Sequence, residues 1–110
     1  MAAREITPIP DRTPNMVFAA ARQVALNLPS GFKLVGIEDL NFRILLSGKM
    51  SLTSWGEKIT IQIYGDARGG SVLEVVSQPK LPTQVVDWGK GKTNVSMLTQ
   101  DILHLLADFR

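Results

Sequence analysis

The chain has 110 residues, a formal net charge of +2, and 45% hydrophobic and 20% charged residues. This length suits one domain with its own core, and the composition is typical of globular proteins. The absence of cysteine excludes disulfides and thiolate metal sites. The charge is too small to indicate nucleic-acid binding by itself. No apolar run reaches the roughly 20 residues that span a bilayer. No apolar segment follows Met1, so we expect a cytoplasmic protein.

The N-terminal segment, residues 1–12, contains Pro8 and Pro10 and few apolar residues. We expect it to be flexible, or to contain a short edge strand from Glu5 to Ile9. Residues 13–110 are predicted to form a single α+β domain.

The first helix is predicted to begin at Thr13-Pro14, because threonine is a good N-cap and proline suits the first helical position. It should end before Pro29. Its apolar face is expected to hold Val17, Ala21, Val24 and Leu28.

Two strands are predicted next, at Phe32–Asp39 and Phe42–Ser51, with a tight turn at Leu40-Asn41. Gly48 interrupts the second strand, which indicates a bulge or the close approach of another element.

The stretch 54–77 is predicted to be a β-hairpin around which the domain is organised. Its first strand alternates Ile59, Ile61 and Ile63 with Lys58, Thr60, Gln62 and Tyr64, the period-two pattern of a half-buried strand. Residues 66–70 supply a glycine-rich turn. In the second strand, Leu73 and Val75 are expected inside, and Glu74 outside between Val72 and Val76.

The region after the hairpin, Gln78–Pro82, is predicted to be a loop, because it contains two prolines. The last helix should begin between Gly91 and Asn94 and run toward Arg110. Its apolar stripe consists of Val95, Leu98, Ile102, Leu105, Leu106 and Phe109. The fold class is therefore α+β: an antiparallel sheet of four strands, or five with the N-terminal strand, and two helices on one face.

Catalytic patterns are weak in this sequence. Asp101, His104 and Asp108 share a helical face and in principle could contact a metal, but a solvated face with weak ion pairs is the favoured interpretation. His104 is the only histidine, and neither a nucleophile elbow nor a phosphate-binding glycine loop occurs. We therefore predict a non-catalytic protein with no cofactor and no metal site.

The segment ahead of the last helix is a candidate anion site. Gly89, Lys90, Gly91 and Lys92 precede a helix whose first N–H groups carry partial positive charge, and Lys58 could converge on the same place. A purely structural role for this segment is the favoured alternative.

The outward face of the sheet is predicted to combine the cations Arg43, Lys49 and Lys58 with apolar side chains. An RNA platform needs two or three aromatic residues, and only Tyr64 qualifies, so we do not favour nucleic acid. The apolar residues Leu45, Val72 and Val76 instead suggest a protein partner or a homo-oligomer. Ala19 and Leu26 offer a second apolar face on the first helix.

Two Trp-Gly pairs flank the central region, and we expect Trp55 and Trp88 to pack as structural pins at one end of the sheet. The run SWGEKITI, followed by the spaced motif S-x-P-x-x-P-T-Q-x-x-D-W-G-K, resembles an uncharacterised bacterial family of small α+β domains. The resemblance covers roughly residues 15–107 and implies the order β-α-β-β-β-β-α, with no assigned chemistry.

The function predicted from these observations is that of a non-catalytic binding or assembly module. A small-molecule or anion-binding pocket near the Trp-Gly junction is the alternative.

Overall fold

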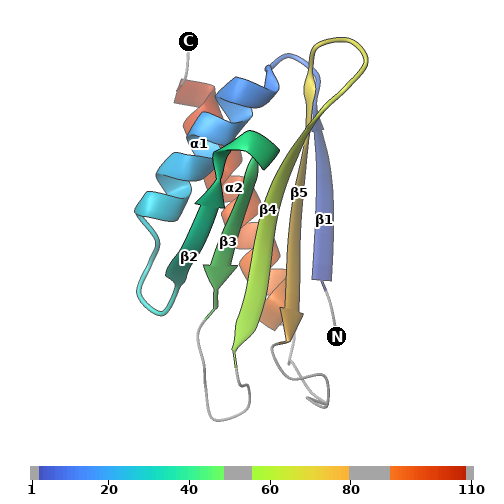
Figure 1. Ribbon diagram of the computed structural model, residues 1–110. Helices are drawn as coiled ribbons and strands as arrows, with labels where there is room; N and C mark the ends of the chain where they lie inside the picture. The colour runs from blue at the N-terminus through green and yellow to red at the C-terminus, as the bar shows by residue number, and fades with distance from the viewer. Residues whose placement is uncertain (1–2, 49–55, 80–89, 109–110) are drawn as a thin grey trace.

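The computed structural model of the protein describes residues 3–48, 56–79 and 90–108 (Figure 1). They form an α+β fold with one five-stranded antiparallel sheet and two helices, which confirms the predicted class and element order. The elements are β1 (Ala3–Ile9), α1 (Pro14–Leu26), β2 (Lys33–Glu38), the 3-10 turn η1 (Asp39–Asn41), β3 (Arg43–Ser47), β4 (Glu57–Gly65), β5 (Ser71–Pro79) and α2 (Lys90–Asp108).

The central hairpin joins β4 to β5 in the sheet order β1-β5-β4-β3-β2. The two strands pair without a register shift from Glu57 opposite Pro79 to Gly65 opposite Ser71. The chain reverses at Asp66, whose Oδ1 accepts hydrogen bonds from the N–H groups of Arg68 at 2.7 Å and Gly70 at 2.8 Å. Gly69 supplies the left-handed residue of the turn, with φ of 85°.

The core lies between one face of the sheet and the two helices, which pack side by side on that face (Figure 1). α1 contacts strands β2 to β5, whereas α2 contacts β5 and β1. The alternation predicted for the hairpin is confirmed. Its inner residues Ile59, Ile61, Ile63, Leu73 and Val75 are all at most 2% exposed. Each such side chain contributes about 1.5–3 kcal/mol through its burial.

The two helices carry the predicted apolar stripes. In α1 the Thr13 hydroxyl accepts the N–H of Met16 at 3.4 Å, as expected of an N-cap, and Val17, Ala21 and Val24 are buried. Leu28 lies beyond the end of α1 and is half-buried. In α2 the residues Val95, Leu98, Ile102 and Leu106 are buried and Leu105 is half-buried, whereas Phe109 lies outside the described residues.

Some boundaries differ from the prediction. The N-terminal segment forms a full seven-residue edge strand, β1, paired with β5. The prediction that Gln78 and Pro79 belong to a loop is wrong, because β5 continues through both. Pro79 is tolerated because it is the last residue of the strand, where its missing N–H removes little of the ladder. α2 begins at Lys90, one residue before the predicted window.

Gly48 marks a close approach, which was one of the two predictions for it. It follows β3 directly, and its N–H donates to the carbonyl oxygen of Glu57 at 2.7 Å. A Cβ atom at position 48 would lie 3.0 Å from the Cβ of Glu57 and 3.5 Å from Cδ1 of Ile59. The absence of a side chain therefore lets the chain pass against the start of β4.

We predict that Gly48→Ala lowers the free energy of unfolding by about 1–3 kcal/mol, because the added methyl group overpacks a buried contact. Gly36→Ala is the matched control, since a Cβ atom there meets no atom within 4 Å. The control should change stability by no more than about 1 kcal/mol in either direction. Urea unfolding measures both variants. Equal stability of Gly48→Ala and wild type would contradict the close-packing argument.

Candidate functional site

The outer face of the sheet is the side opposite the helices. Alternation along the strands brings ten of its residues around one shallow hollow of about 410 Å³. They come from four of the five strands, and they are Arg4, Arg43, Leu45, Lys58, Thr60, Gln62, Tyr64, Glu74, Val76 and Gln78. This surface combines cations, hydrogen-bonding groups and apolar side chains, as predicted for the outward residues.

Glu74 is the centre of a polar cluster on this face. Arg4 on the neighbouring strand β1 forms an ion pair with Glu74, with 3.2 Å between Nε and Oε2. Tyr64 on β4 donates its hydroxyl to the other carboxylate oxygen at 3.0 Å. The Glu74 side chain is only 17% exposed, whereas that of Arg4 is 63% exposed. The cluster thus fixes the positions of Tyr64 and Arg4 and leaves both accessible to a partner.

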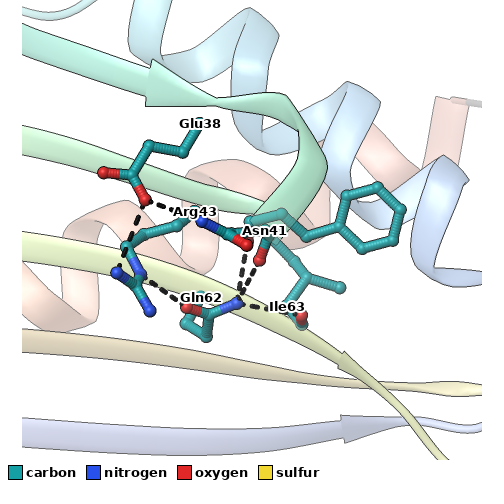
Figure 2. Close-up of polar contacts among 6 residues, drawn as sticks. Glu38, Asn41, Arg43, Gln62 and Ile63 are labelled. Carbon is teal, nitrogen blue, oxygen red and sulfur yellow. Dashed lines mark hydrogen bonds and ion pairs between the residues drawn. The ribbon is translucent and has the colours of Figure 1, made fainter.

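Gln62 ties the outer face to the connection between β2 and β3 (Figure 2). Its Nε2 donates to the carbonyl oxygens of Asn41 at 2.7 Å and Phe42 at 3.2 Å. Its Oε1 accepts from Nε of Arg43 at 2.9 Å. Arg43 also reaches Glu38 with 3.4 Å between Nη1 and Oε1. One amide side chain therefore holds a whole strand connection in place.

The connection needs this support because Phe42 has a left-handed backbone, with φ of 51°. Such a conformation is unfavourable for a bulky residue and persists where its surroundings fix it. The sequence pattern predicted Gln62 as an outward residue, and its register agrees. The residue is nevertheless only 9% exposed, because its side chain bonds to Arg43 and to the η1 turn.

We predict that Gln62→Glu lowers the free energy of unfolding by about 1–3 kcal/mol, because a carboxylate oxygen would replace the N–H donors that face the carbonyl groups of Asn41, Phe42 and Ile63. Gln78→Glu makes the same chemical change at an exposed position of the outer face and should alter stability by at most about 0.5 kcal/mol. Thermal or urea unfolding separates the two. Losses of equal size would show that the Gln62 contacts do not stabilise the fold.

The titration of the Tyr64 phenol reports on the polar cluster around Glu74. The hydrogen bond to Glu74 raises the pKa of Tyr64 above its usual value of 10.0, and the negative charge of Glu74 acts in the same direction. Arg43 and Arg4 act against this shift. A raised pKa in the folded state means that folding favours the protonated phenol. The resulting stabilisation is present below about pH 10 and is lost as the pH rises through the folded-state pKa.

We predict that Glu74→Gln moves the titration midpoint of Tyr64 down toward pH 10, because the carboxylate acceptor and its charge are both removed. Tyr64 is the only tyrosine of the chain, so the ultraviolet absorbance of tyrosinate reports on this one group. Gln78→Glu should leave the midpoint nearly unchanged. An unaltered midpoint in Glu74→Gln would contradict the hydrogen-bonded cluster.

The apolar part of the outer face extends further than the sequence indicated. Leu45, Val72 and Val76 are half-buried on this side, as predicted. Ile6 is 56% exposed and Val35 63% exposed. Ile6 lies directly opposite Glu74, which places it on the same face. Alternation within the N-terminal segment could have identified Ile6 once its pairing with β5 was known.

The predicted anion site is described only in part. Lys58 is exposed on the outer face, whereas Lys92 is exposed in the first turn of α2 and borders a different hollow with Thr93, Ser96 and Met97. Lys90 and Gly91 form the start of α2. Gly89, Trp55 and Trp88 lie outside the described residues, as does Lys49. The anion site and the tryptophan pins therefore stay predictions.

The helical face with His104 borders a groove of about 370 Å³ between α1 and α2. Asp101, His104 and Asp108 are all exposed, and Val24 and Leu105 contribute apolar surface to the groove. Within the described ranges, no three acidic, histidine or cysteine side chains are placed to hold a metal ion together.

Glu57 is a buried carboxylate that the sequence patterns did not single out. It is 2% exposed on the inner face of β4, and Ser77 donates its hydroxyl to Oε2 at 3.1 Å. The same alternation that places Ile59 inside also places Glu57 inside, so the signal was available. A buried, hydrogen-bonded carboxylate constrains the end of the sheet next to Gly48.

Comparison with protein-family models and with curated proteins finds no match for the sequence. Solved structures share the fold. A protein of Nitrosospira multiformis has a TM-score of 0.65 at 13% identity, covering 100% of this chain and 97% of that one. Ara h 8.0201 has a TM-score of 0.63 at 12% identity, covering 99% and 96%. TTHA0849 from Thermus thermophilus has a TM-score of 0.53 at 13% identity, covering 98% and 92%. At these identities the likeness concerns the fold alone.

Among the described residues, no helix combines the length and the apolar composition that crossing a bilayer requires.

Proposed function

We propose that the protein is a non-catalytic binding or assembly module whose binding surface is the outer face of the sheet. The observation that carries the proposal is the composition of that face. Half-buried Leu45, Val72 and Val76 and the exposed Ile6 share a surface that packs against neither helix in the described part of the chain. A sheet face that carries several solvent-accessible apolar side chains is typical of an interaction site.

The polar cluster supports the same proposal. Its contacts position Tyr64 and Arg4 before any partner arrives, and a hydrogen bond to Gln62 positions Arg43 in the same way. Side chains that are already ordered lose little conformational entropy on binding, so they favour recognition. Tyrosine and arginine are also residue types that are enriched in protein interfaces.

A pocket for a small molecule or an anion near the Trp-Gly junction is the alternative proposal. Lys58 and Lys92 are its only predicted residues whose side chains are described, and each borders its own hollow. The outer face is therefore the better supported of the two.

The test is capture of a partner protein by the tagged domain from an extract of its own cells. We predict that the Val76→Arg variant no longer captures a partner that the wild type binds, because the variant places a bulky cation in the apolar part of the face. Val76 is half-buried on the outer face, directly opposite Thr60. Gln100→Arg adds the same charge at an exposed position of α2 and should retain the partner. Equal capture by both variants would place the binding surface elsewhere and contradict the proposal.

A further inference from the structure

A second hollow of the outer face arises from an irregularity in β2. The pairing of β2 with β3 shifts between Leu34 and Gly36, so that Val35 is an extra residue beside Leu45. The bulge leaves Val35 63% exposed. Gly36 has no side chain to fill the space, and a Cβ atom there would meet nothing within 4 Å. Next to Gly36, which lies opposite Leu45, is an open hollow of about 230 Å³ that is lined by Val35, Leu45, Leu46, Ser47 and Lys58.

The rim of this hollow is positively charged. Lys33 lies opposite Ser47, and Ser47 lies opposite Lys58, so the three side chains form one row across β2, β3 and β4 on the same face. Both lysines are exposed. Neither has an ion-pair partner among residues 3–48, 56–79 and 90–108. An apolar hollow bordered by Lys58 therefore lies next to a second lysine, Lys33, and neither ammonium group pairs with a carboxylate in the described part of the chain.

The opposite end of the same β2–β3 hairpin presents the complementary feature. Leu40, in the η1 turn, is 100% exposed. It follows Glu38 and Asp39, whose side chains are 39% and 63% exposed. Glu38 meets Arg43 on the outer face, whereas Asp39 meets Arg22 of α1 on the side of the helices. Because an ionised carboxylate offers about four acceptor sites, Glu38 retains capacity for a further donor. This end is thus an apolar knob beside one acidic group of the outer face.

We infer that a second copy of this chain docks on the outer face, with its Leu40 in the hollow between Val35 and Leu45. The lysines of the row beside the hollow then face Glu38 of the docked copy, so that apolar and charged groups are matched at once. The hollow is smaller than the roughly 300–1,000 Å³ of pockets that bury a small molecule, and it suits a single protruding side chain. This inference rests on the proposed function, because it identifies the partner of that face.

A two-fold axis satisfies both contacts. The knob and the hollow lie at opposite ends of the hairpin, roughly 10–15 Å apart for a rise of about 3.3 Å per residue. Two hairpins placed antiparallel across such an axis bring each Leu40 to the other copy's hollow, which is the isologous arrangement of most homodimers. Two short hairpins cover little area, so the dimer belongs to the class of small, transient interfaces below about 1,200 Å².

Sedimentation equilibrium of the full chain tests the inference, from tens to several hundred micromolar protein. The expected result is an average mass that rises with concentration above the monomer mass of 12.1 kDa. Leu40→Lys removes the apolar side chain that docks. Gly36→Leu adds a side chain that occupies the hollow in its place. Each variant should raise the dissociation constant at least about tenfold. Salt should weaken the wild-type dimer, because the matched charges are screened.

The control is Leu26→Lys, which makes the same change at another exposed leucine, 59% exposed on α1. It should dimerise as the wild type does. Thermal unfolding establishes that all variants are folded. A wild type that stays monomeric throughout, or a dimer that survives both Leu40→Lys and Gly36→Leu, overturns the inference. If only Leu26→Lys abolishes dimerisation, the inference is also overturned, and the contact is assigned to α1. The capture experiment with Val76→Arg is independent, so the outer face can still bind another protein if self-docking fails.

Discussion

The burial of one face of the β4–β5 hairpin is the constraint on which the rest of the structure depends. Its inner residues, from Ile59 to Val75, are almost completely excluded from solvent, and both helices reach this hairpin. Because side chains alternate along a strand, a register shift by one residue would expose this entire set. The fixed register also determines which residues remain on the other side. The outer face is therefore a direct consequence of the core.

The outer face has its own internal order, and long-range contacts create it. Gln62 of β4 supports a strand connection about twenty residues earlier in the sequence, and Glu74 joins side chains from the first and fourth strands. Such cross-strand contacts hold side chains in one geometry on a surface that the helices do not cover. Ordered side chains on the exposed face of a small sheet favour specific over non-specific binding, since they can also reject a wrong partner.

Local patterns predicted the architecture well and the site only in part. Period-two alternation identified the hairpin and its inner residues, and Thr13-Pro14 identified the start of α1. The same pattern placed Gln62 outward, but it could not show that Arg43 and the η1 turn would cover its amide, because those groups are distant in sequence. The bulge at Val35 was equally inaccessible, since it depends on the pairing with β3.

The two edges of the sheet explain why recognition should use a face. An uninterrupted edge strand is a template for pairing with another chain. In β1 this template is broken by Pro8, which has no N–H to donate. In β2 it is broken by the bulge between Leu34 and Gly36. The β2 irregularity has a second effect, because it turns Val35 outward and leaves open space at Gly36. The bulge in β2 thus discourages another strand from pairing with this edge. It also lies beside the hollow on the outer face, where a side chain of a partner can make a selective contact.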